Sequence, residues 1–289
     1  ENIVNNKTNN RLYEKLYDKA KQFGLHDIVE KQFDQRLFLV NGDIQEDLLG
    51  LSMEKYIYLT KTITDIHHVA ANVNNWAPYD QLHLANVVGT RNVIQFATTH
   101  LHKTVNFYSS VAVVLNHIND FVSENDEIDP KRLLNGYEQT KYVGEQMCIK
   151  ARSEFALKTN IFRFGQVGPA YNAGRTGKEN DLLSQIIKII LHVKLFPMDN
   201  NSVIIDILPV DILCNIIVSI AKNDKNMNKT FQLRNTCANS LVFYDAINKY
   251  CPVTQTSAKE FLSTVAKTSF NQDNYQLRAT QDMLIHSNT

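Results

Sequence analysis

Apolar positions in the first 170 residues follow two different spacings. Apolar residues three and four positions apart predict helices over residues 12–23, 81–100 and 136–152. Short apolar runs predict strands over residues 36–40, 65–71, 104–110 and 159–164. Strands that alternate with helices are typical of parallel βαβ units. The sequence therefore predicts an α/β fold with a Rossmann-like, doubly wound parallel sheet.

The pattern changes after Pro169. The turn-rich stretch GPAYNAGRTGKEN at 168–180 precedes a helix with one apolar face that is expected from residue 182 onward. We therefore expect a dinucleotide-binding domain over residues 1–170 and a smaller C-terminal substrate domain over residues 171–289.

A second helix with one apolar face is expected after Pro209. Asp211 precedes apolar residues at helical spacing, so it is expected to be the N-cap of this helix. The stretch of about 205–236 is expected to return to the first domain. The stretch from residue 269 to the end is polar, which predicts a frayed terminus.

The charge balance limits the choice of partners. Of 289 residues, 30 are Lys or Arg and 30 are Asp or Glu. No electrostatic attraction toward nucleic acid or an anionic membrane is therefore expected. The amino terminus lacks the apolar stretch of a secretory signal, and lysines and a histidine interrupt the most apolar run, 182–196. We expect a cytoplasmic protein whose partners are small molecules or other proteins.

The four cysteines, Cys148, Cys214, Cys237 and Cys251, are far apart and form no CxxC motif. No histidine lies at zinc-ligand spacing from them. The sequence therefore predicts reduced, structural thiols, with neither a disulfide framework nor a metal site.

The segment NGYEQTKYVGEQM at 135–147 sets Tyr137 and Lys141 four positions apart on a predicted helix. Tyr17 and Lys21 have the same spacing, so spacing alone identifies no function. Only the later pair follows a strand that ends in serines, NFYSSVAV. Ligands of open α/β sheets bind at the carboxyl ends of the strands, so context favours Tyr137 and Lys141 as functional residues.

Tyr137, Lys141 and a nearby serine have the chemistry needed for proton transfer to a carbonyl. A phenol is a weak acid at neutral pH, and an ammonium one turn along the helix is expected to lower the pKa of Tyr137. Ser110, preferred over Ser109, is expected to donate to a carbonyl oxygen as negative charge develops there. Gly144 and Cys148 continue the Tyr137 and Lys141 stripe, where small side chains would let the helix approach the sheet.

Several motifs carry a family resemblance. ANVVGT (85–90), FYSSVAV (107–113) and GYEQTKYVGEQ (136–146) resemble the extended short-chain dehydrogenases/reductases. GRTGKENDLLSQIIK (174–188) and IDILPVDILCNIIV (205–218) resemble, more narrowly, the thioester reductase domains that terminate nonribosomal peptide synthetases and related carboxylic acid reductases. The resemblance covers roughly residues 8–250 and rests on the order and spacing of the motifs.

The resemblance implies a catalytic tetrad of Asn86, Ser110, Tyr137 and Lys141. In such enzymes the serine and tyrosine hold the substrate carbonyl, and the lysine also bonds the nicotinamide ribose. The asparagine helps to hold a helix bend and a water that links the lysine to solvent.

The resemblance also implies a set of cofactor-binding residues. They are Asp43, Ile44, His68, Ala70, Ala71, Asn86, Tyr137, Lys141, Phe164 and Gly165. Asp43 falls where the family contacts adenine, and the HHVAA segment (67–71) falls where backbone lines the cofactor. Phe164 and Gly165 stand, after Arg163, where the family usually has Arg-Pro-Gly, so the course of that loop is expected to differ.

The implied activity is NADPH-dependent reduction of an acyl thioester on a phosphopantetheinyl carrier protein, which releases an aldehyde or, after a second reduction, an alcohol. NAD is the alternative cofactor. Residues 170–196 are expected to form the acyl and pantetheine channel. Three alternatives stay open: another extended reductase such as a nucleotide-sugar epimerase or dehydratase, an acylating aldehyde dehydrogenase that uses a cysteine, and a non-catalytic dinucleotide-binding protein.

One feature of dinucleotide folds is missing from this sequence. The ten glycines form no GxxGxxG-type turn, which would bring backbone to the cofactor pyrophosphate. We expect that an upstream segment of about 35 to 50 residues carries this turn in the working protein.

Overall fold

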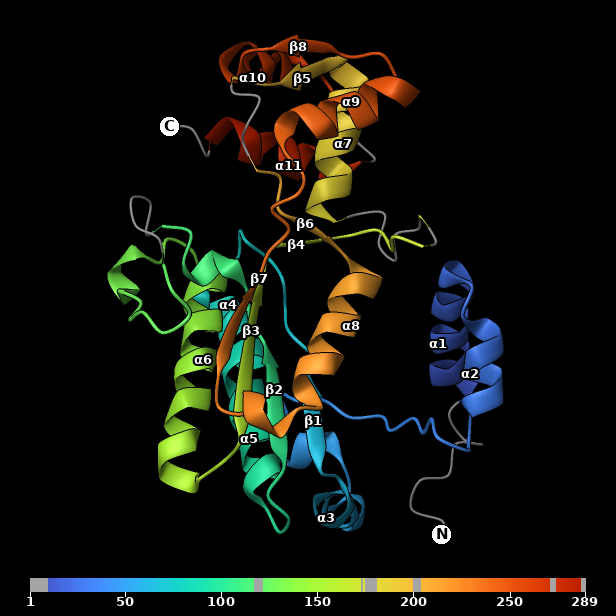
Figure 1. The fold of residues 1–289 in the computed structure, drawn as a ribbon, viewed down its shortest axis with the longest axis vertical. Helices are drawn as coiled ribbons and strands as arrows, with labels where there is room; N and C mark the ends of the chain where they lie inside the picture. Colours follow the sequence, from blue (N-terminus) through green and yellow to red (C-terminus); the bar gives the residue numbers. More distant parts are fainter. Residues whose placement is uncertain are drawn as a thin grey trace. The chain divides into compact units, whose positions relative to one another are not determined.

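The computed structural model describes residues 10–116, 122–172, 174, 181–199, 204–270 and 274–286 (Figure 1). These residues form two compact units. Unit 1 contains the described parts of Glu1–Gly165 and Asp211–Leu233, and unit 2 contains those of Gln166–Val210 and Arg234–Thr289. Each unit is therefore built from two separate stretches of sequence.

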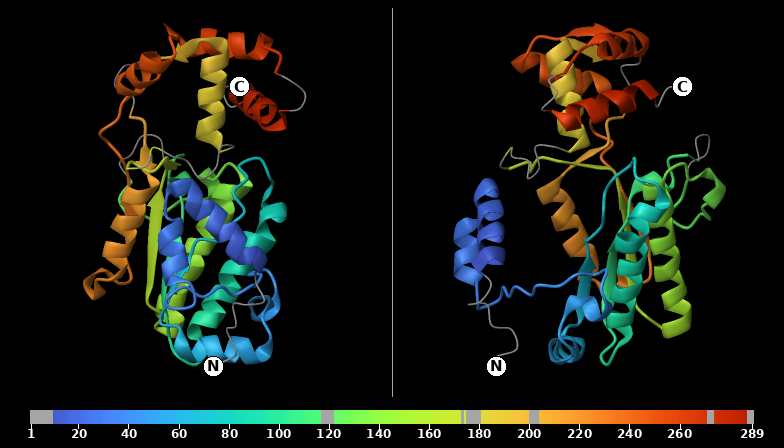
Figure 2. Two further views of the ribbon diagram at one scale, coloured as in Figure 1. Left: turned by 90° about the vertical axis from the view of Figure 1, so that its right-hand side faces the viewer. Right: turned by 180° about the vertical axis from the view of Figure 1, so that it is seen from behind.

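Unit 1 is organised around a parallel sheet with the strand order β1-β2-β3-β7. Its strands are β1 (Asp65–His68), β2 (Thr104–Tyr108), β3 (Thr159–Phe164) and β7 (Thr230–Leu233). Helices α5 (Gly89–Thr98) and α6 (Gly136–Phe155) cover one face of the sheet, and α8 (Val210–Ala221) covers the other (Figures 1 and 2). The doubly wound α/β fold predicted from the sequence is confirmed.

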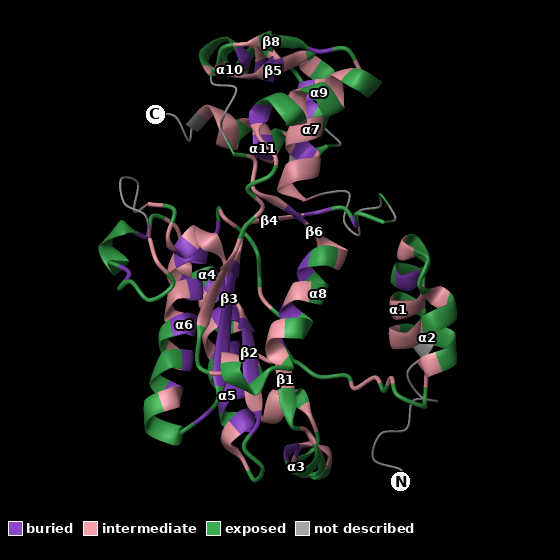
Figure 3. Cartoon of the chain, viewed as in Figure 1, coloured by how far each residue is buried: buried purple, intermediate pink, exposed green. Residues whose placement is uncertain are grey.

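The core of unit 1 lies between the sheet and helices α5 and α6. Buried residues concentrate on β2 and β3 (Figure 3). Phe107 and Ile161 of the sheet pack with Ile94 of α5 and Cys148 of α6. A methyl group added to Gly144 would lie 2.6 Å from Cζ of Phe107. The small residue in α6 therefore allows the close approach of helix and sheet that the sequence suggested.

Further helices complete the described part of unit 1. They are α1 (Asn10–Phe23), α2 (His26–Gln32), η2 (Asp47–Gly50), α3 (Met53–Thr62), α4 (Tyr79–His83), η3 (Leu84–Val88), η4 (Val111–Val113), η5 (Pro130–Arg132) and η6 (Asp224–Asn226). Helices α4, η3 and α5 follow one another without a break, and η3 is a turn of π-helix.

The strand predicted over residues 36–40 does not form. Leu37 makes only an isolated bridge with Phe33, because the chain turns back on itself between them. An extended segment becomes a strand only where a neighbouring backbone offers a ladder of partners, and residues 38–40 have none among the described residues. The apolar run was therefore a misleading signal.

Unit 2 contains two short parallel strand pairs and four helices among the described residues. The pairs are β4 (Gln166–Gly168) with β6 (Ile207–Pro209) and β5 (Leu195–Pro197) with β8 (Thr254–Thr256). The helices are α7 (Leu182–Val193), α9 (Ser240–Tyr250), α10 (Ala258–Lys267) and α11 (Tyr275–His286). Ile189, Phe196, Phe261 and Val265 form the centre of their shared core.

Two sequence predictions about helix ends are wrong. Helix α8 begins at Val210, so Asp211 lies inside its first turn and is not the N-cap. The polar terminus does not fray over residues 275–286, which form α11. Leu277 and Leu284 of this helix pack against the core of unit 2, and burial of a few apolar positions outweighs the polar composition.

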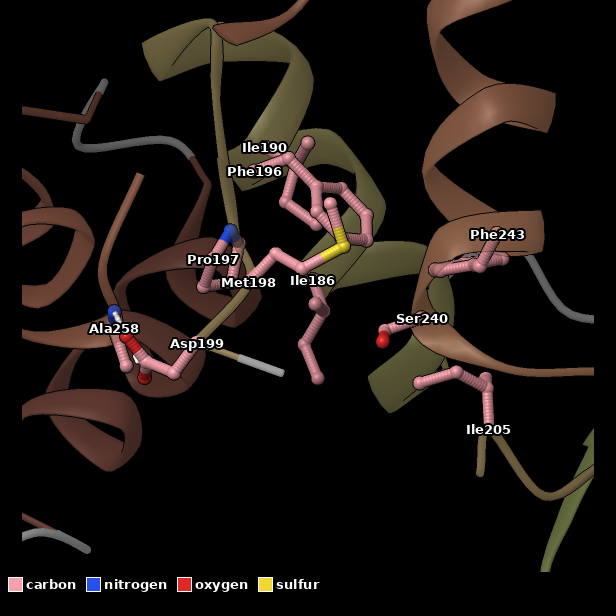
Figure 4. Close-up of a pocket in the computed structure, with 10 residues that line it drawn as sticks. All are labelled: Ile186, Ile190, Phe196, Pro197, Met198, Asp199, Ile205, Ser240, Phe243 and Ala258. Carbon is pink, nitrogen blue, oxygen red and sulfur yellow. Dashed lines mark hydrogen bonds between the residues drawn. The ribbon is translucent and has the colours of Figure 1, made fainter. Parts of the chain in front are cut away.

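An apolar pocket of about 300 Å³ lies within unit 2 (Figure 4). Ile186 and Ile190 of α7, Phe196 of β5 and Phe243 of α9 form most of its wall. Asp199 lies at the pocket, where its carboxylate accepts a hydrogen bond from the Ala258 amide at 3.1 Å.

Two features are absent from the described residues. No helix in these ranges combines the length and apolar character needed to cross a bilayer. No three His, Cys, Asp or Glu side chains in the same ranges are arranged to hold a metal ion.

Candidate active site

The carboxyl ends of β1, β2 and β3 meet the first turns of α6 in unit 1. Helix α6 starts where it does because Asn135 caps it: its Oδ1 accepts from the Glu138 amide at 2.9 Å. The Glu138 carboxylate in turn accepts from the Asn135 side chain at 2.7 Å. This reciprocal cap satisfies donors at the helix terminus and fixes the first turn, which carries Tyr137.

Gly136 allows the loop before α4 to pack against the start of α6. A methyl group on Gly136 would lie 2.6 Å from the carbonyl oxygen of Ala77. Tyr137 is consequently 9% exposed, packed with Ala77, Leu82 and Ala112. The phenol is thus held by a close backbone contact on one side and by apolar packing on the other.

The Ser110 side chain lies beside Tyr137, where hydrogen bonding from Ser110 opposes the rise in the pKa of the phenol. Ser110 Oγ also accepts from the Ala112 amide at 3.1 Å, since Ser110 caps the short helix η4. The Ser110 hydroxyl proton is therefore available for the phenolic oxygen.

The neighbouring serine points elsewhere. Ser109 is buried and donates to Oε1 of Glu145 at 2.5 Å. Successive side chains at a strand end face opposite directions. Of the two serines, Ser110 is thus the one that the structure brings to Tyr137.

Lys141 lies one turn beyond Tyr137 and is 5% exposed. Its Nζ donates to the backbone carbonyl of Tyr108 at 2.7 Å. The same nitrogen is 5.3 Å from the centroid of the Phe107 ring and 5.9 Å from that of Tyr137. Burial lowers the pKa of Lys141 to about 8, which the negative charge of Glu145 partly opposes.

The expected lowering of the pKa of Tyr137 by Lys141 is wrong for this structure. Burial raises the pKa of Tyr137, and the only opposing contribution comes from the Ser110 hydrogen bond. The physical reason lies in the lysine: because its pKa is about 8, it loses its proton at a lower pH than the phenol does. At neutral pH the site therefore holds a protonated phenol beside an ammonium group.

Asn86 lies in the π-helical turn η3 and is 3% exposed. Its amide clamps the loop after β1, donating to the Asn72 carbonyl at 3.0 Å and accepting from the Asn72 amide at 2.7 Å. The same Nδ2 donates to the Thr140 hydroxyl of α6 at 3.0 Å. Asn86 thus ties together three segments of unit 1, and helix bulges of this kind are frequent at functional sites.

His68 ends β1 and is buried beneath the site. Its Nε2 lies 3.0 Å from the Thr90 hydroxyl, which itself donates to the Asn86 carbonyl at 2.6 Å. The single Thr90 proton is used there, so the Nε2–H of His68 is the donor to Thr90. Burial, with a smaller effect of Lys141, lowers the pKa of His68 to about 4, so the ring is neutral.

The remaining residues of the implied cofactor set lie in the loop after β1, in the turn at residues 43–44 and at the end of β3. In the loop after β1, Ala70 is exposed and Ala71 is half-buried. Asp43 is exposed and accepts from the Gln45 amide at 2.9 Å. The Ile44 carbonyl accepts from the Asn92 side chain of α5 at 2.9 Å, which attaches this turn to unit 1.

Phe164 ends β3 and packs edge-on against Tyr108, with ring centroids 6.1 Å apart. Gly165 follows it at the boundary of unit 1. Sequence reasoning had no role for Arg163 beyond a motif position and missed its partner. Arg163 Nη2 pairs with Oε2 of Glu145 at 2.7 Å, and their side chains are 3% and 0% exposed. A glutamate four residues after Lys141, on the buried face of α6, was the available signal.

The control pair in α1 has different surroundings. Tyr17 contacts the rings of Tyr13 and His26, at 5.9 and 6.0 Å between centroids. It lies at no strand end, so its lysine spacing is incidental. Burial raises the pKa of Cys148 to about 12 and also raises that of Cys214, which weakens these two thiols as nucleophiles.

The donor set suits the nicotinamide-ribose half of a dinucleotide. An ammonium group, two hydroxyls and the backbone of Ala70 and Ala71 lie at the carboxyl ends of parallel strands in one unit. The phosphate half would need a glycine turn, which the ten glycines of this chain do not supply.

This fold and these motifs define a short-chain dehydrogenase/reductase. Residues 2–217 match the model of the NAD-binding family described as "Male sterility protein", and the chain belongs to this family. The family is named for the binding of NAD.

The curated relatives are much larger proteins. The chain is 30% identical over 219 residues to a linear gramicidin synthase of Brevibacillus parabrevis, which covers 74% of this chain and 4% of that protein. It is 30% identical over 209 residues to "L-2-aminoadipate reductase large subunit" of Candida glabrata, with 67% and 15% covered. The chain thus spans a small part of the length of these relatives.

Solved structures agree on the fold. The terminal R domain of the myxalamid PKS-NRPS pathway superposes with a TM-score of 0.85 at 24% identity, covering 98% of this chain and 71% of that one. A thiolation-reductase di-domain from an archaeal nonribosomal peptide synthetase gives 0.70 at 21% identity, covering 92% and 60%. UDP-glucuronic acid 4-epimerase of Bacillus cereus gives 0.60 at 17% identity, covering 91% and 85%.

Proposed function

We propose that this chain catalyses NADPH-dependent reduction of an acyl thioester, with release of an aldehyde. The observation that carries the proposal is the grouping of Ser110, just after β2, with Tyr137 and Lys141 of α6, in which Lys141 bonds the carbonyl of Tyr108 at the end of β2. Such a group can bind a carbonyl oxygen and give it a proton, which reduction of a carbonyl requires.

The residues of the site divide the work. When bound, the dinucleotide supplies the hydride that reduces the thioester carbonyl carbon. Ser110 and Tyr137 donate hydrogen bonds to the carbonyl oxygen as it becomes negative, and the Tyr137 proton moves to that oxygen. The resulting hemithioacetal loses its thiol and leaves an aldehyde. The positive charge of Lys141, whose Nζ lies 5.9 Å from the centroid of the Tyr137 ring, favours the phenolate that forms in this step.

The dinucleotide would be held by the same face of unit 1. Lys141 and Tyr137 would contact the nicotinamide ribose, and the backbone of Ala70 and Ala71 would line the cofactor. Asp43 and Ile44 would lie at the adenine, and Phe164 and Gly165 at the nicotinamide side. Buried His68 and Asn86 would support this face from below, since both are already hydrogen-bonded within the protein.

The acyl group is proposed to arrive on the phosphopantetheine arm of a carrier protein. The support is the similarity to large synthetases and to a thiolation-reductase di-domain. The second candidate is a nucleotide-sugar epimerase, which the superposition on UDP-glucuronic acid 4-epimerase favours, although with a lower TM-score.

Product analysis separates the two candidates. The protein is supplied either with NADPH and an acyl thioester on a carrier protein, or with NAD and a UDP-hexuronic acid. We expect aldehyde and free carrier thiol in equal amounts, with one NADPH oxidised for each aldehyde. Formation of an epimerised sugar without net consumption of the dinucleotide would instead establish the epimerase.

Unit 2 is proposed to be the substrate domain, and its apolar pocket is proposed to take part of the acyl group. Ile186, Ile190 and Phe196 lie both in the pocket wall and within the expected channel at residues 170–196. Residues 173 and 175–180 of that channel lie outside the described residues. A volume of about 300 Å³ lined by aliphatic and aromatic side chains suits an apolar chain.

Filling the pocket tests this assignment. Ile186→Trp should raise KM for a long-chain acyl thioester while leaving KM for the acetyl thioester unchanged. Ile187→Trp, on the same helix but not among the residues of the pocket wall, is the matched control. Equal effects of the two substitutions on both substrates would exclude the pocket from substrate binding.

A further inference from the structure

Glu145, one helical turn beyond Lys141 in α6, forms a buried ion pair with Arg163. Arg163 of β3 donates to Glu145 of α6 through Nε at 2.9 Å and through Nη2 at 2.7 Å. Ser109 of β2 donates to the same carboxylate at 2.5 Å. Burial of two charges is costly and contributes little net stability, so a pair at this depth calls for another explanation.

The carboxylate lies on the same face of α6 as the catalytic side chains. Tyr137, Lys141 and Glu145 are each four residues apart in the helix, so they lie one above another. Glu145 is 0% exposed and Lys141 is 5% exposed, and their interaction is therefore weakly screened by solvent.

The groups that act on Lys141 come from two strands and one helix. They are His68 of β1, Phe107 and Tyr108 of β2, and Tyr137, Glu145 and Cys148 of α6. Arg163 of β3 joins this group through its bond to Glu145. His68 is neutral because its pKa is about 4, and the Cys148 thiol is neutral because its pKa is about 12. The raised pKa of Tyr137 keeps it neutral as well. Of these described groups, Glu145 alone carries a negative charge.

We propose that Glu145 is a positioning residue that holds Lys141 in its charged form, with Arg163 and Ser109 fixing the carboxylate in place. The ammonium nitrogen itself is bonded to the Tyr108 carbonyl, so Glu145 acts across one helical turn. Glu145 is the carboxylate that pairs with buried Arg163, so loss of Glu145 would leave the guanidinium group without this counter-charge. This inference rests on the proposed function only for its consequence in catalysis.

The test measures the lysine directly. The protein without cofactor is labelled with [ε-13C]lysine, and the Lys141 resonance is assigned by its loss in Lys141→Met. We expect this resonance to titrate near pH 8 in the unaltered protein and at least about one pH unit lower in Glu145→Gln, which is a tenfold or greater loss of proton affinity. The titration needs no turnover, so it succeeds or fails independently of the proposed activity.

Glu138→Gln is the matched control. Glu138 is also a buried glutamate of α6, but its carboxylate accepts from the Asn135 side chain and the Leu134 amide at the helix start. This substitution should leave the Lys141 titration in place. A purely structural role of Glu145 predicts no displacement of the Lys141 midpoint in either variant, and that result would overturn the proposal.

A double variant guards against a folding defect in Glu145→Gln. Glu145→Gln with Arg163→Gln removes both charges and leaves no unpaired cation. The Lys141 midpoint should again lie below that of the unaltered protein, because Glu145, whose negative charge raises the pKa of Lys141, is lost. A midpoint that is unchanged or higher in the folded double variant would contradict the proposed role.

Discussion

The pKa of Lys141 predicts how the reaction rate depends on pH. Burial places this pKa at about 8, well below the ordinary value of 10.5. The lysine is then about 90% protonated at pH 7 and about 9% protonated at pH 9. If only the ammonium form supports proton transfer from Tyr137, kcat should fall about tenfold between pH 7 and pH 9. The phenol itself stays protonated over this range, because burial raises its pKa.

The assay is the rate of aldehyde release over a range of NADPH and thioester concentrations up to saturation, measured from pH 6 to pH 9.5. The alkaline midpoint of kcat/KM, which reports ionisations of the free enzyme, should coincide with the Lys141 midpoint measured by NMR. Stability should be checked at each pH, so that unfolding is not mistaken for loss of the ammonium. A rate that stays constant to pH 9.5 in folded protein would refute the assignment of Lys141 to this step.

Three substitutions should change the stability of the fold in directions that the structure predicts. Lys141→Met should abolish turnover yet raise the free energy of unfolding at pH 7 by about 2 kcal/mol, measured by chemical denaturation. The buried charge costs about 3 kcal/mol below pH 8, and the bond of the lysine to the Tyr108 carbonyl offsets about 1 kcal/mol of this cost. A free energy of unfolding equal to or below that of the unaltered protein would contradict this sum. The unfolded chain protonates His68 below about pH 6.5, whereas the folded protein protonates it only near pH 4, so acidification to pH 5 should lower the free energy of unfolding by about 2 kcal/mol through this residue. His68→Gln should abolish this contribution. An unchanged acid unfolding transition would argue against a buried neutral ring. Gly136→Ala should lower both the melting temperature and kcat, and it should reduce the free energy of unfolding by about 1–3 kcal/mol, because the added methyl group would lie 2.6 Å from the Ala77 carbonyl oxygen. Unchanged values of both would show that the loop at Ala77 moves to accommodate the methyl group.

The regular elements of unit 1 were predictable because local sequence and tertiary structure agree. The strand predicted at 159–164 is observed over the same residues, and its buried side chains explain the continuous apolar run. The run at 36–40 looked similar but lacks a neighbouring strand to pair with. Pairing is a property of the whole fold, and apolar periodicity alone does not report it.

In the candidate site, too, some features could be predicted from local sequence and others depend on the whole fold. The order of Ser110, Tyr137 and Lys141 along strand and helix could be read from the sequence, because the carboxyl end of a parallel strand is a recognisable position. The direction of the pKa change at Tyr137 could not, since it depends on burial of both Tyr137 and Lys141. The pairing of Glu145 with Arg163 was hidden for a related reason: helix and strand approach each other only in the folded chain.

The central claim is that the Tyr137 hydroxyl gives its proton to the substrate carbonyl. The most direct measurement is kcat of Tyr137→Phe for a carrier-bound acyl thioester at pH 7, with the melting temperature measured alongside. We expect kcat to fall about 100-fold or more while the protein stays folded, because the phenyl ring keeps the packing of Tyr137 and lacks only the hydroxyl proton. Full activity in Tyr137→Phe would contradict the claim and remove the mechanism built on it.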